Sequence, residues 1–575
     1  MMKPSFLAAL LGAVLVAGCA TVPAPTGAAA TQTSRPNYLV IVADDLGWSD
    51  LGSFGGEIDT PNLDRLAMSG VRFTGFHTAA TCSPTRAMLM TGVDHHLAGF
   101  GTMAEILTDA TRSAPGYEGY LNDRVATIAE LLGAGGYRTL MAGKWHLGSA
   151  PDRVPAARGF ERSFALMEGA SNHFGADQGP VWQEAGLATH YNEDGVQVSF
   201  PNGTYSSDYF TDRLIEFLDE GARTGDQRPF FAYLPFTAPH WPLQAPADVV
   251  AKYKGRYDAG YEALRKARLA RQKELGLVSP DAEAHDLVFV TPWDELSKEQ
   301  QAIEARKMEV YAAMVDRLDQ NVGRLVATLK QLGRYEDTVI IFLGDNGPEG
   351  SVIDSPTTVY RKPPNPGLGV DNRLENIGRP TSYITYGPGW AQANSAPSML
   401  MKGYPTEGGI RVAAFVSGRG VVEPGRIIDA NLDVRDIAPT LLDLASLPQP
   451  ATHDDRSILP MEGHSLSGIF KREVEAVRPA DEPIGYELFS LSALRKGDWK
   501  IVFLPKPDKH VRTPRLQSIG TGRWKLFNIA RDPGETVDLA DSEPEKLREL
   551  VKDYQAYARA KGVVQMSGTA RTEQP

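Results

Sequence analysis

Four short apolar runs, each ending abruptly in polar residues, limit the folds available to this 575-residue chain. The runs are residues 38–43, 139–142, 230–234 and 339–343. Short apolar runs without alternation are typical of strands buried on both faces of an α/β sheet. Ligands of open α/β sheets bind beyond the carboxyl ends of the strands. We therefore expect the polar residues that follow the four runs to meet at one edge of a sheet.

Two of these polar clusters are rich in oxygen ligands. Asp44 and Asp45 follow the first run, and Asp345 and Asn346 follow the last. Carboxylates with an amide, and without an accompanying set of Cys and His, suit calcium or magnesium rather than zinc. Acidic pairs are also common in turns after strands, so either pair alone is weak support for a metal site.

The other two clusters, and a later loop, supply cations and histidines. Lys144 and His146 follow the second run, His240 follows the third, and Lys402 lies farther downstream. Considered alone, each of these residues is better explained as a surface lysine or a helix-capping histidine than as a functional residue. Together they offer positive charge for anionic oxygens and a proton for a departing alkoxide.

The segment Cys82-Ser83-Pro84-Thr85-Arg86 sets a cysteine at the start of a predicted helix. Pro84 suits the first turn, where its missing N–H is not needed, and the following residues can continue the helix. Arg86 lies on the same helix face as Cys82, and the free N–H groups of the first turn favour an anion. This arrangement suits a tetrahedral oxyanion, and the alternative is a buried structural cysteine.

The pattern C-x-P-x-R, followed here by Thr91-Gly92, resembles the signature of the type I sulfatases, whose cysteine is oxidised to Cα-formylglycine. Residues 94–99, 158–160 and 386–391 are similar to the bacterial arylsulfatase branch of that family. The resemblance implies an α/β fold of the alkaline phosphatase-like type, with a large mixed sheet flanked by helices. A smaller C-terminal α+β domain, an antiparallel sheet plus a helix, is expected to follow.

The resemblance also implies a function, which is hydrolysis of sulfate monoesters, most simply aryl sulfates, to an alcohol or phenol plus sulfate. One Ca²⁺ ion would be held by Asp44, Asp45, Asp345 and Asn346 and would touch the modified Cys82. The implied catalytic residues are Cys82, Arg86, Lys144, His146, His240, Asp345 and Lys402. In these roles Asp345 is the base, His240 or Lys402 protonates the leaving alcohol, and His146 accepts a proton when sulfate departs. A formylglycine-generating enzyme is the implied modifying partner.

Two other functions stay open on the sequence. A phosphonate monoester or phosphodiester hydrolase would share the cysteine motif and the fold. A surface lipoprotein that binds sulfated glycans without turnover would belong to a different class. Lys and Arg total 59 against 71 Asp and Glu, a net charge of −12 without a basic block, which gives nucleic-acid binding little electrostatic support.

The first residues resemble a bacterial lipoprotein signal. Lys3 precedes an apolar run at residues 6–16, too short to cross a bilayer, and Val16-Ala17-Gly18-Cys19 resembles a lipobox. We expect a signal peptide at residues 1–18, lipid on Cys19 and a flexible tether at 19–36. The expected location is the periplasmic face of the outer membrane, or the periplasm. An ordinary secretory signal or a cytosolic protein with an apolar start are the alternatives.

The remainder is predicted to form a catalytic domain at residues 37–470 and a small domain at 471–575. Helical periodicity marks two segments, one at 125–132 and one at 311–332 that Gly333 would cap. After residue 471 the pattern becomes strand-like at 484–489, 499–504 and 524–529, and an amphipathic helix follows at 544–561.

Overall fold

The structure is a computed structural model that describes residues 35–109, 111–352, 366–506 and 519–564. The predicted signal peptide, Cys19 and almost all of the tether lie outside the described residues. The described residues from Pro36 onward belong to one compact unit. Within the described ranges, no helix is long and apolar enough to cross a membrane.

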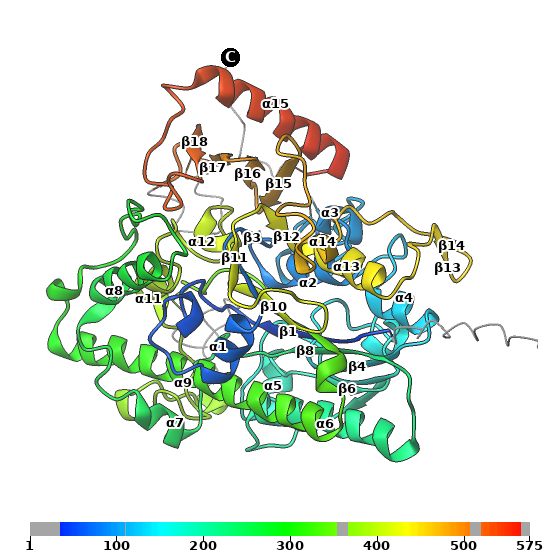
Figure 1. The fold of residues 1–575 in the computed structure, drawn as a ribbon. Helices are drawn as coiled ribbons and strands as arrows, with labels where there is room; N and C mark the ends of the chain where they lie inside the picture. Colours follow the sequence, from blue (N-terminus) through cyan, green and yellow to red (C-terminus); the bar gives the residue numbers. More distant parts are fainter. Residues whose placement is uncertain (1–34, 110, 353–365, 507–518, 565–575) are drawn as a thin grey trace, which may run out of the picture. The chain divides into compact units, whose positions relative to one another are not determined.

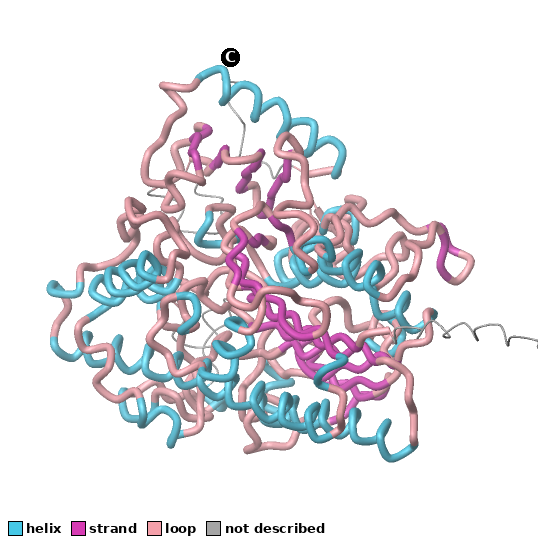
Figure 2. Tube along the Cα trace, in the orientation of Figure 1, coloured by secondary structure: helices cyan, strands magenta, loops and turns pink. Residues whose placement is uncertain are grey.

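A ten-stranded mixed sheet forms the centre of this unit (Figures 1 and 2). Its strand order is β11-β2-β10-β9-β1-β8-β4-β5-β6-β7. The strands are β1 Asn37–Ala43, β2 Val71–Phe73, β4 Arg138–Lys144, β5 Arg162–Leu166, β6 Tyr191–Glu193, β7 Val196–Val198, β8 Phe230–Pro235, β9 Thr338–Gly344, β10 Ala414–Gly418 and β11 Arg426–Ile428.

The four predicted strands are confirmed as β1, β4, β8 and β9, which are adjacent and parallel. The register pairs Ala43 of β1 with Gly344 of β9, and Val42 with Pro235 of β8. Their carboxyl ends therefore lie at one edge, as the apolar runs predicted. β10 is antiparallel to both β9 and β2, which makes the sheet mixed.

Helices cover both faces of the sheet (Figure 1). They are α1 Pro61–Met68, α2 Cys82–Thr91, α3 His95–Ala98, α4 Ile128–Ala134, α5 Pro180–Ala185, α6 Ser206–Thr224, α7 Ala247–Lys252, α8 Gly260–Glu274, α9 Lys298–Gln331, α11 Gly387–Asn394, α12 Glu407–Ile410, α13 Ile437–Leu444 and α14 Ser467–Phe470. Alternate side chains of β1 enter opposite cores because strand side chains alternate between faces. Leu39 joins the core of α6 and α9, whereas Val40 joins that of α2, α4 and α13.

Two helix predictions need small corrections. Thr127 and Glu130 form a capping box that starts α4 at Ile128, so Val125 is buried but lies before the helix. The predicted 311–332 helix is the second half of α9, whose C-cap is Leu332. Gly333, one residue beyond, has a left-handed φ of 65°, which glycine adopts without steric cost.

The C-terminal segment forms a four-stranded antiparallel sheet with one helix on its face. The elements are β15 Pro483–Leu488, β16 Leu491–Lys496, β17 Trp499–Phe503, β18 Trp524–Asn528 and α15 Pro544–Lys561. Three strands and the helix were predicted, and β16 was missed because its sequence lacks a continuous apolar run. The domain boundary predicted after residue 470 falls in the connection between α14 and β15.

Candidate active site

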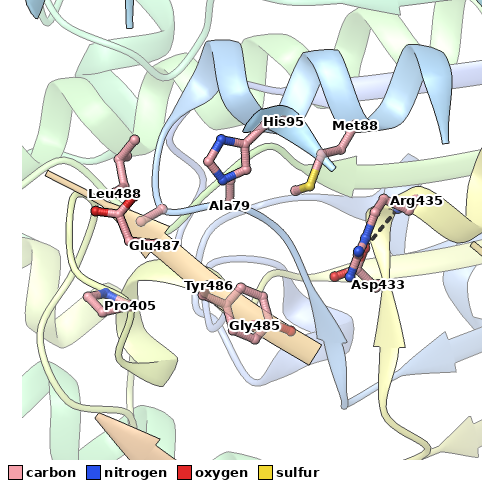
Figure 3. Close-up of a pocket in the computed structure, with 11 residues that line it drawn as sticks. Ala79, Met88, His95, Pro405, Asp433, Arg435, Gly485, Tyr486, Glu487 and Leu488 are labelled. Atoms are coloured by element: carbon pink, nitrogen blue, oxygen red, sulfur yellow. Dashed lines mark hydrogen bonds and ion pairs between the residues drawn. The ribbon is translucent and has the colours of Figure 1, made fainter. Parts of the chain in front are cut away.

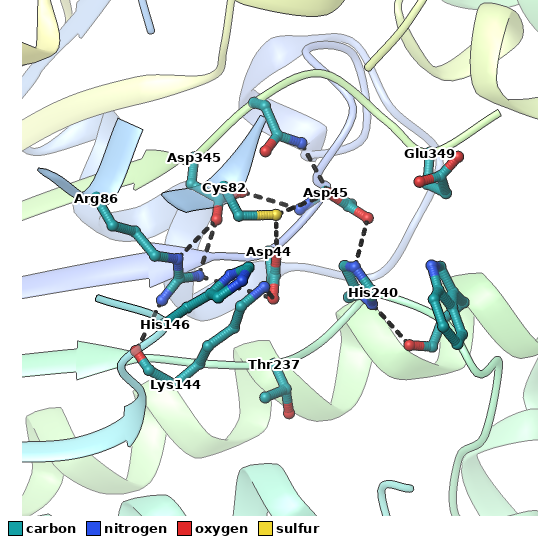
Figure 4. Close-up of polar contacts among 12 residues, drawn as sticks. Asp44, Asp45, Cys82, Arg86, Lys144, His146, Thr237, His240, Asp345 and Glu349 are labelled. Carbon is teal, nitrogen blue, oxygen red and sulfur yellow. Dashed lines mark hydrogen bonds and ion pairs between the residues drawn. The ribbon is translucent and has the colours of Figure 1, made fainter. Parts of the chain in front are cut away.

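The ends of the four central strands bring the predicted polar residues together (Figure 4). Asp44 and Asp45 follow β1, Lys144 ends β4, and Asp345 and Asn346 follow β9. His146, His240 and Lys402 come from loops after β4, β8 and α11. Side-chain contacts join all of these residues except His146 into one buried cluster, and His146 contacts Glu105 instead.

Cys82 is the first residue of α2 and is buried at the centre of the cluster. Its Sγ lies 3.3 Å from Oδ1 of Asp44 and 3.9 Å from Oδ1 of Asp45. Burial, and then the charge of Asp44, raise the pKa of the Cys82 thiol well above its usual value. An unmodified thiol here is therefore neutral and a poor nucleophile.

Arg86 ties two strand ends together beneath Cys82. Its Nε and Nη2 donate to the same oxygen of Asp345, at 3.0 and 2.8 Å. Its Nη1 donates to the backbone carbonyl of Lys144 at 2.8 Å. The guanidinium is fully buried, so this rigid fork fixes the Asp345 carboxylate instead of reaching solvent.

Two lysines neutralise the paired carboxylates. Nζ of Lys144 lies 2.6 Å from Oδ2 of Asp44, and Nζ of Lys402 lies 2.7 Å from Oδ1 of Asp45. Burial alone would raise the pKa of Asp44, but Lys144 and further cations hold it well below its usual range. Burial raises the pKa of Asp45 to about 7 although Lys402 opposes it. The two neighbouring carboxyl groups thus differ in their electrostatic environment.

His240 lies against the same carboxylate as Lys402. Its Nε2 is 3.5 Å from Oδ2 of Asp45, and its Nδ1 is 2.7 Å from the carbonyl of Trp241. Burial, and then the charge of Lys402, lower the pKa of His240 well below its usual value. The imidazole is therefore neutral in this arrangement. Its one ring hydrogen is on Nδ1, because the Trp241 carbonyl can only accept a hydrogen bond.

His146 is held by a residue that the sequence did not single out. Its Nε2 lies 2.9 Å from Oε1 of Glu105, which sits in the short 3-10 helix Ala104–Ile106. Glu349 was also missed, and its carboxylate lies 3.6 Å from Nζ of Lys402. Glu349 follows the Asp345-Asn346 pair closely and could have been noticed, whereas no local pattern connects Glu105 with His146.

The oxygen-rich cluster fits a hard cation. Ligand atoms of Asp44, Asp45, Cys82 and His240 lie within 4.8 Å of one another. Nδ2 of Asn346 donates to Oδ1 of Asp45 at 2.7 Å, while Oδ1 of Asn346 is buried without a partner among the described residues. A half-turn of the amide would offer this oxygen to a cation instead.

The side chain of Asp345 contacts the backbone of Asp45. Its Oδ1 accepts the N–H of Asp45 at 3.2 Å. Asp45 adopts a left-handed φ of 67°, which is uncommon outside glycine. Such conformations persist where the surroundings fix them, and they concentrate at functional sites.

A second polar region lies between α2, α3 and the C-terminal sheet, where His95 and Glu487 line a small cavity (Figure 3). Next to it, His96 contacts Asp94 through Nδ1 and Glu487 through Nε2, both at 3.0 Å. Asp94, His95 and His96 could in principle hold a metal. Both nitrogens of His96 already face carboxylates, so its contacts explain it as a structural link to β15.

Comparison with known proteins gives consistent matches. The sulfatase family model matches residues 36–447. The chain is 45% identical over 544 residues to a Schizosaccharomyces pombe protein described as an uncharacterized sulfatase, covering 93% of this chain and 95% of that one. It is 40% identical over 447 residues to the arylsulfatase of Klebsiella aerogenes, covering 77% and 94%.

Solved structures agree on the fold. The crystal structure of the PsFucS1 sulfatase from Pseudoalteromonas sp. matches with a TM-score of 0.61 at 22% identity, covering 94% of this chain and 92% of that one. Such neighbours are sulfatases of the alkaline phosphatase-like fold. The predicted fold, a large mixed sheet with flanking helices and a small C-terminal antiparallel sheet, is thereby confirmed.

Proposed function

Because this chain belongs to the sulfatase family, we propose that it hydrolyses sulfate monoesters, with aryl sulfates as its preferred substrates. Family membership and the arylsulfatase relatives support a sulfuric ester hydrolase. The aryl preference is inferred from the arylsulfatase of Klebsiella aerogenes. The observation that carries the proposal is the burial of Cys82 between the Asp44 and Asp45 carboxylates, with Lys144 and Lys402 alongside.

The family in general implies a metal ion and a formylglycine, and we propose Ca²⁺ and a formylglycine at position 82. The hydrated aldehyde would supply a hydroxyl nucleophile, and the cation would neutralise sulfate oxygens. Asp44, Asp45, Asp345 and Asn346 are the residues proposed to hold the cation. Oxygen donors, including a buried amide oxygen without a partner, favour calcium or magnesium over zinc.

The remaining side chains have three proposed roles, which are to bind sulfate, to accept a proton from the nucleophile and to protonate the leaving oxygen. Lys144 and Lys402 would bind its non-bridging oxygens, because both ammonium groups already face anionic oxygens. Arg86 holds Asp345 in a fixed orientation, which lets this carboxylate receive the proton of the attacking hydroxyl. Lys402 and His240 converge on Asp45. Either can protonate the leaving oxygen, Lys402 through its ammonium group and His240 once its Nε2 has taken up a proton.

Sulfate release from purified protein tests this function. We expect hydrolysis of nitrophenyl sulfate, its loss in Cys82→Ala without loss of folding, and formylglycine at position 82 by peptide mass spectrometry. Full activity with only unmodified Cys82 would contradict the proposed nucleophile. Faster turnover of phosphonate monoesters than of aryl sulfates would assign the other hydrolase activity, and binding without release would assign a glycan-binding protein.

We further propose that the protein is a lipoprotein of the bacterial outer membrane, facing the periplasm. Support comes from the lipobox-like segment before Cys19 alone. Membrane fractionation of the wild type and Cys19→Ser tests it. Equal distribution of both proteins in the soluble fraction would contradict lipid attachment.

A further inference from the structure

We propose that Glu105 is a positioning residue that fixes the tautomer and orientation of His146, so that Nδ1 of His146 faces residue 82 as a proton acceptor. The inference rests on the proposed function, which needs a group to receive a proton when sulfate departs. Glu105 lies outside the set of residues that the cysteine motif and strand ends brought together.

The His146 ring is fixed on several sides. Only 5% of the residue is exposed, and its φ of 58° is left-handed. A Cβ atom at Gly169 would lie 2.5 Å from Cε1 of His146, so only glycine leaves room for the ring. In Figure 4 the ring projects toward the cluster that holds Cys82 and Lys144.

The two ring nitrogens have different environments. Nε2 lies 2.9 Å from Glu105, whose side chain is 43% exposed, at the outer side of the ring. Nδ1 is buried and has no hydrogen-bond partner among the described residues. Because the two ring nitrogens point in widely different directions, Nδ1 is turned away from Glu105.

The charge of Glu105 decides which nitrogen carries the proton. Burial opposes ionisation, but His146 lowers the pKa of Glu105 to about 2. A carboxylate only accepts hydrogen bonds, so Nε2 must hold the hydrogen. A neutral imidazole carries one ring hydrogen, which leaves a lone pair on Nδ1.

The Glu105–His146 pair can accept one proton during turnover. As sulfate departs, the free hydroxyl on the same carbon at position 82 would give its proton to Nδ1. The electron pair of that O–H bond would become the second bond of the restored aldehyde, and the carbon–oxygen bond to sulfate would break with its electrons leaving on sulfate. The resulting imidazolium has its Nε2–H against the Glu105 carboxylate, which stays ionised and stabilises the positive ring. A carboxylate that orients a histidine base and stabilises its cation acts in this way in hydrolases of other folds.

Kinetics of Glu105→Ala and Glu105→Gln test the role. We expect Glu105→Ala to lower kcat about 10²-fold and to lower KM with it, so that kcat/KM changes little, because the affected step follows formation of the covalent intermediate. The kcat that remains should be the same for aryl and alkyl sulfates, because the slowed step comes after the alcohol has left. Glu105→Gln, whose amide oxygen can still accept the Nε2–H, should recover part of the rate. Asp109→Asn, an exposed acid in the same segment, is the matched control and should behave as wild type.

A second readout does not depend on turnover. Ring ¹⁵N spectra of histidine-labelled Cys82→Ala protein, with His146 assigned through His146→Gln, report the tautomer directly. We expect the Nε2–H form when Glu105 is present and a mixture in Glu105→Ala. If wild-type protein hydrolyses no sulfate ester, the proposed function fails, while these spectra still test the pair.

A clear set of results would overturn the inference. It is wrong if Glu105→Ala retains the Nε2–H tautomer and a kcat within twofold of wild type. It is also wrong if Glu105→Ala lowers kcat by the same factor in a His146→Ala background, since Glu105 would then act without His146.

Discussion

Lys500, in strand β17 of the C-terminal sheet, donates a 2.8 Å hydrogen bond to Glu407, in the same segment as Lys402. Both side chains are buried, and Lys500 has a second partner in Glu535 at 2.9 Å. The other oxygen of Glu407 lies 3.0 Å from Nε2 of His77, just ahead of the segment that leads to α2. Buried polar contacts thus join the C-terminal sheet to two segments of the active site.

Lys500→Met should strongly destabilise the protein. The change leaves the carboxylates of Glu407 and Glu535 buried without the cation between them. Removing one partner of a buried ion pair costs about 3–5 kcal/mol, and uptake of a proton by Glu535, whose pKa burial raises to about 7, limits the loss. Denaturant unfolding measures the effect.

Lys496→Met, one strand away, is the matched control. Lys496 also contacts two carboxylates, Glu549 and Asp553, each at 2.9 Å, but its side chain is 21% exposed. Water and salt screen such pairs, so the expected loss is about 0.2–1 kcal/mol. Similar losses for the two variants would show that the buried Lys500 contacts contribute no special stability.

Removing the proposed general acid should affect poor leaving groups most. Without a proton donor, an alkyl sulfate must expel an alkoxide, whereas nitrophenyl sulfate expels a stable phenolate. General acid catalysis is typically worth about 10²–10⁴-fold. We therefore expect losses of that order for alkyl sulfates, and modest ones for nitrophenyl sulfate, in whichever of His240→Ala and Lys402→Ala removes the acid. Equal losses for both substrates in both variants would show that these residues only bind sulfate.

Metal removal should abolish turnover reversibly. Asn346→Ala should lower metal content and kcat, because it removes an oxygen ligand and leaves only the carboxylates of Asp44, Asp45 and Asp345 to hold the ion. Elemental analysis of purified protein measures the loss. Asn376→Ala, in a partly exposed short helix, is the control. Stoichiometric zinc in active wild-type protein would contradict the calcium assignment.

His96 should make stability depend on pH. Burial opposes its protonation, but Asp94 and Glu487 raise its pKa from 6.5 to about 9. A raised pKa means that the ion pairs stabilise the fold fully below pH 6.5, by about 3 kcal/mol, and that this contribution is lost as the pH rises through 9.

The neighbours of His96 are included in this expectation. His95, whose pKa burial lowers to about 3, stays neutral in this range, and the nearby hydroxyls of Tyr117 and Tyr557 titrate at higher pH than usual. The destabilisation by His96→Gln, measured by denaturant unfolding, should therefore be larger at pH 6 than at pH 10. A pH-independent difference would mean that His96 is not protonated in the folded protein.

The sequence was sufficient for the parts of the protein that repeat a local pattern. Unbroken apolar runs identified β1, β4, β8 and β9, because strands buried on both faces have no polar face to interrupt them. Their polar ends identified the cluster, because parallel strands place their carboxyl ends together. β16 was missed although five of its six residues are buried, since buried polar residues such as Ser492 and Arg495 interrupt its apolar sequence as they would in a loop.

The residue types of the site were determined by the sequence alone, because the cysteine motif and the strand ends are contiguous segments. Tertiary structure alone decided how those residues pair. Glu105 meets His146, and Lys500 meets Glu407, across long stretches of chain. Such a contact between residues far apart in the chain produces no periodicity or spacing in the sequence. It depends on packing and burial and not on neighbouring residues in the chain.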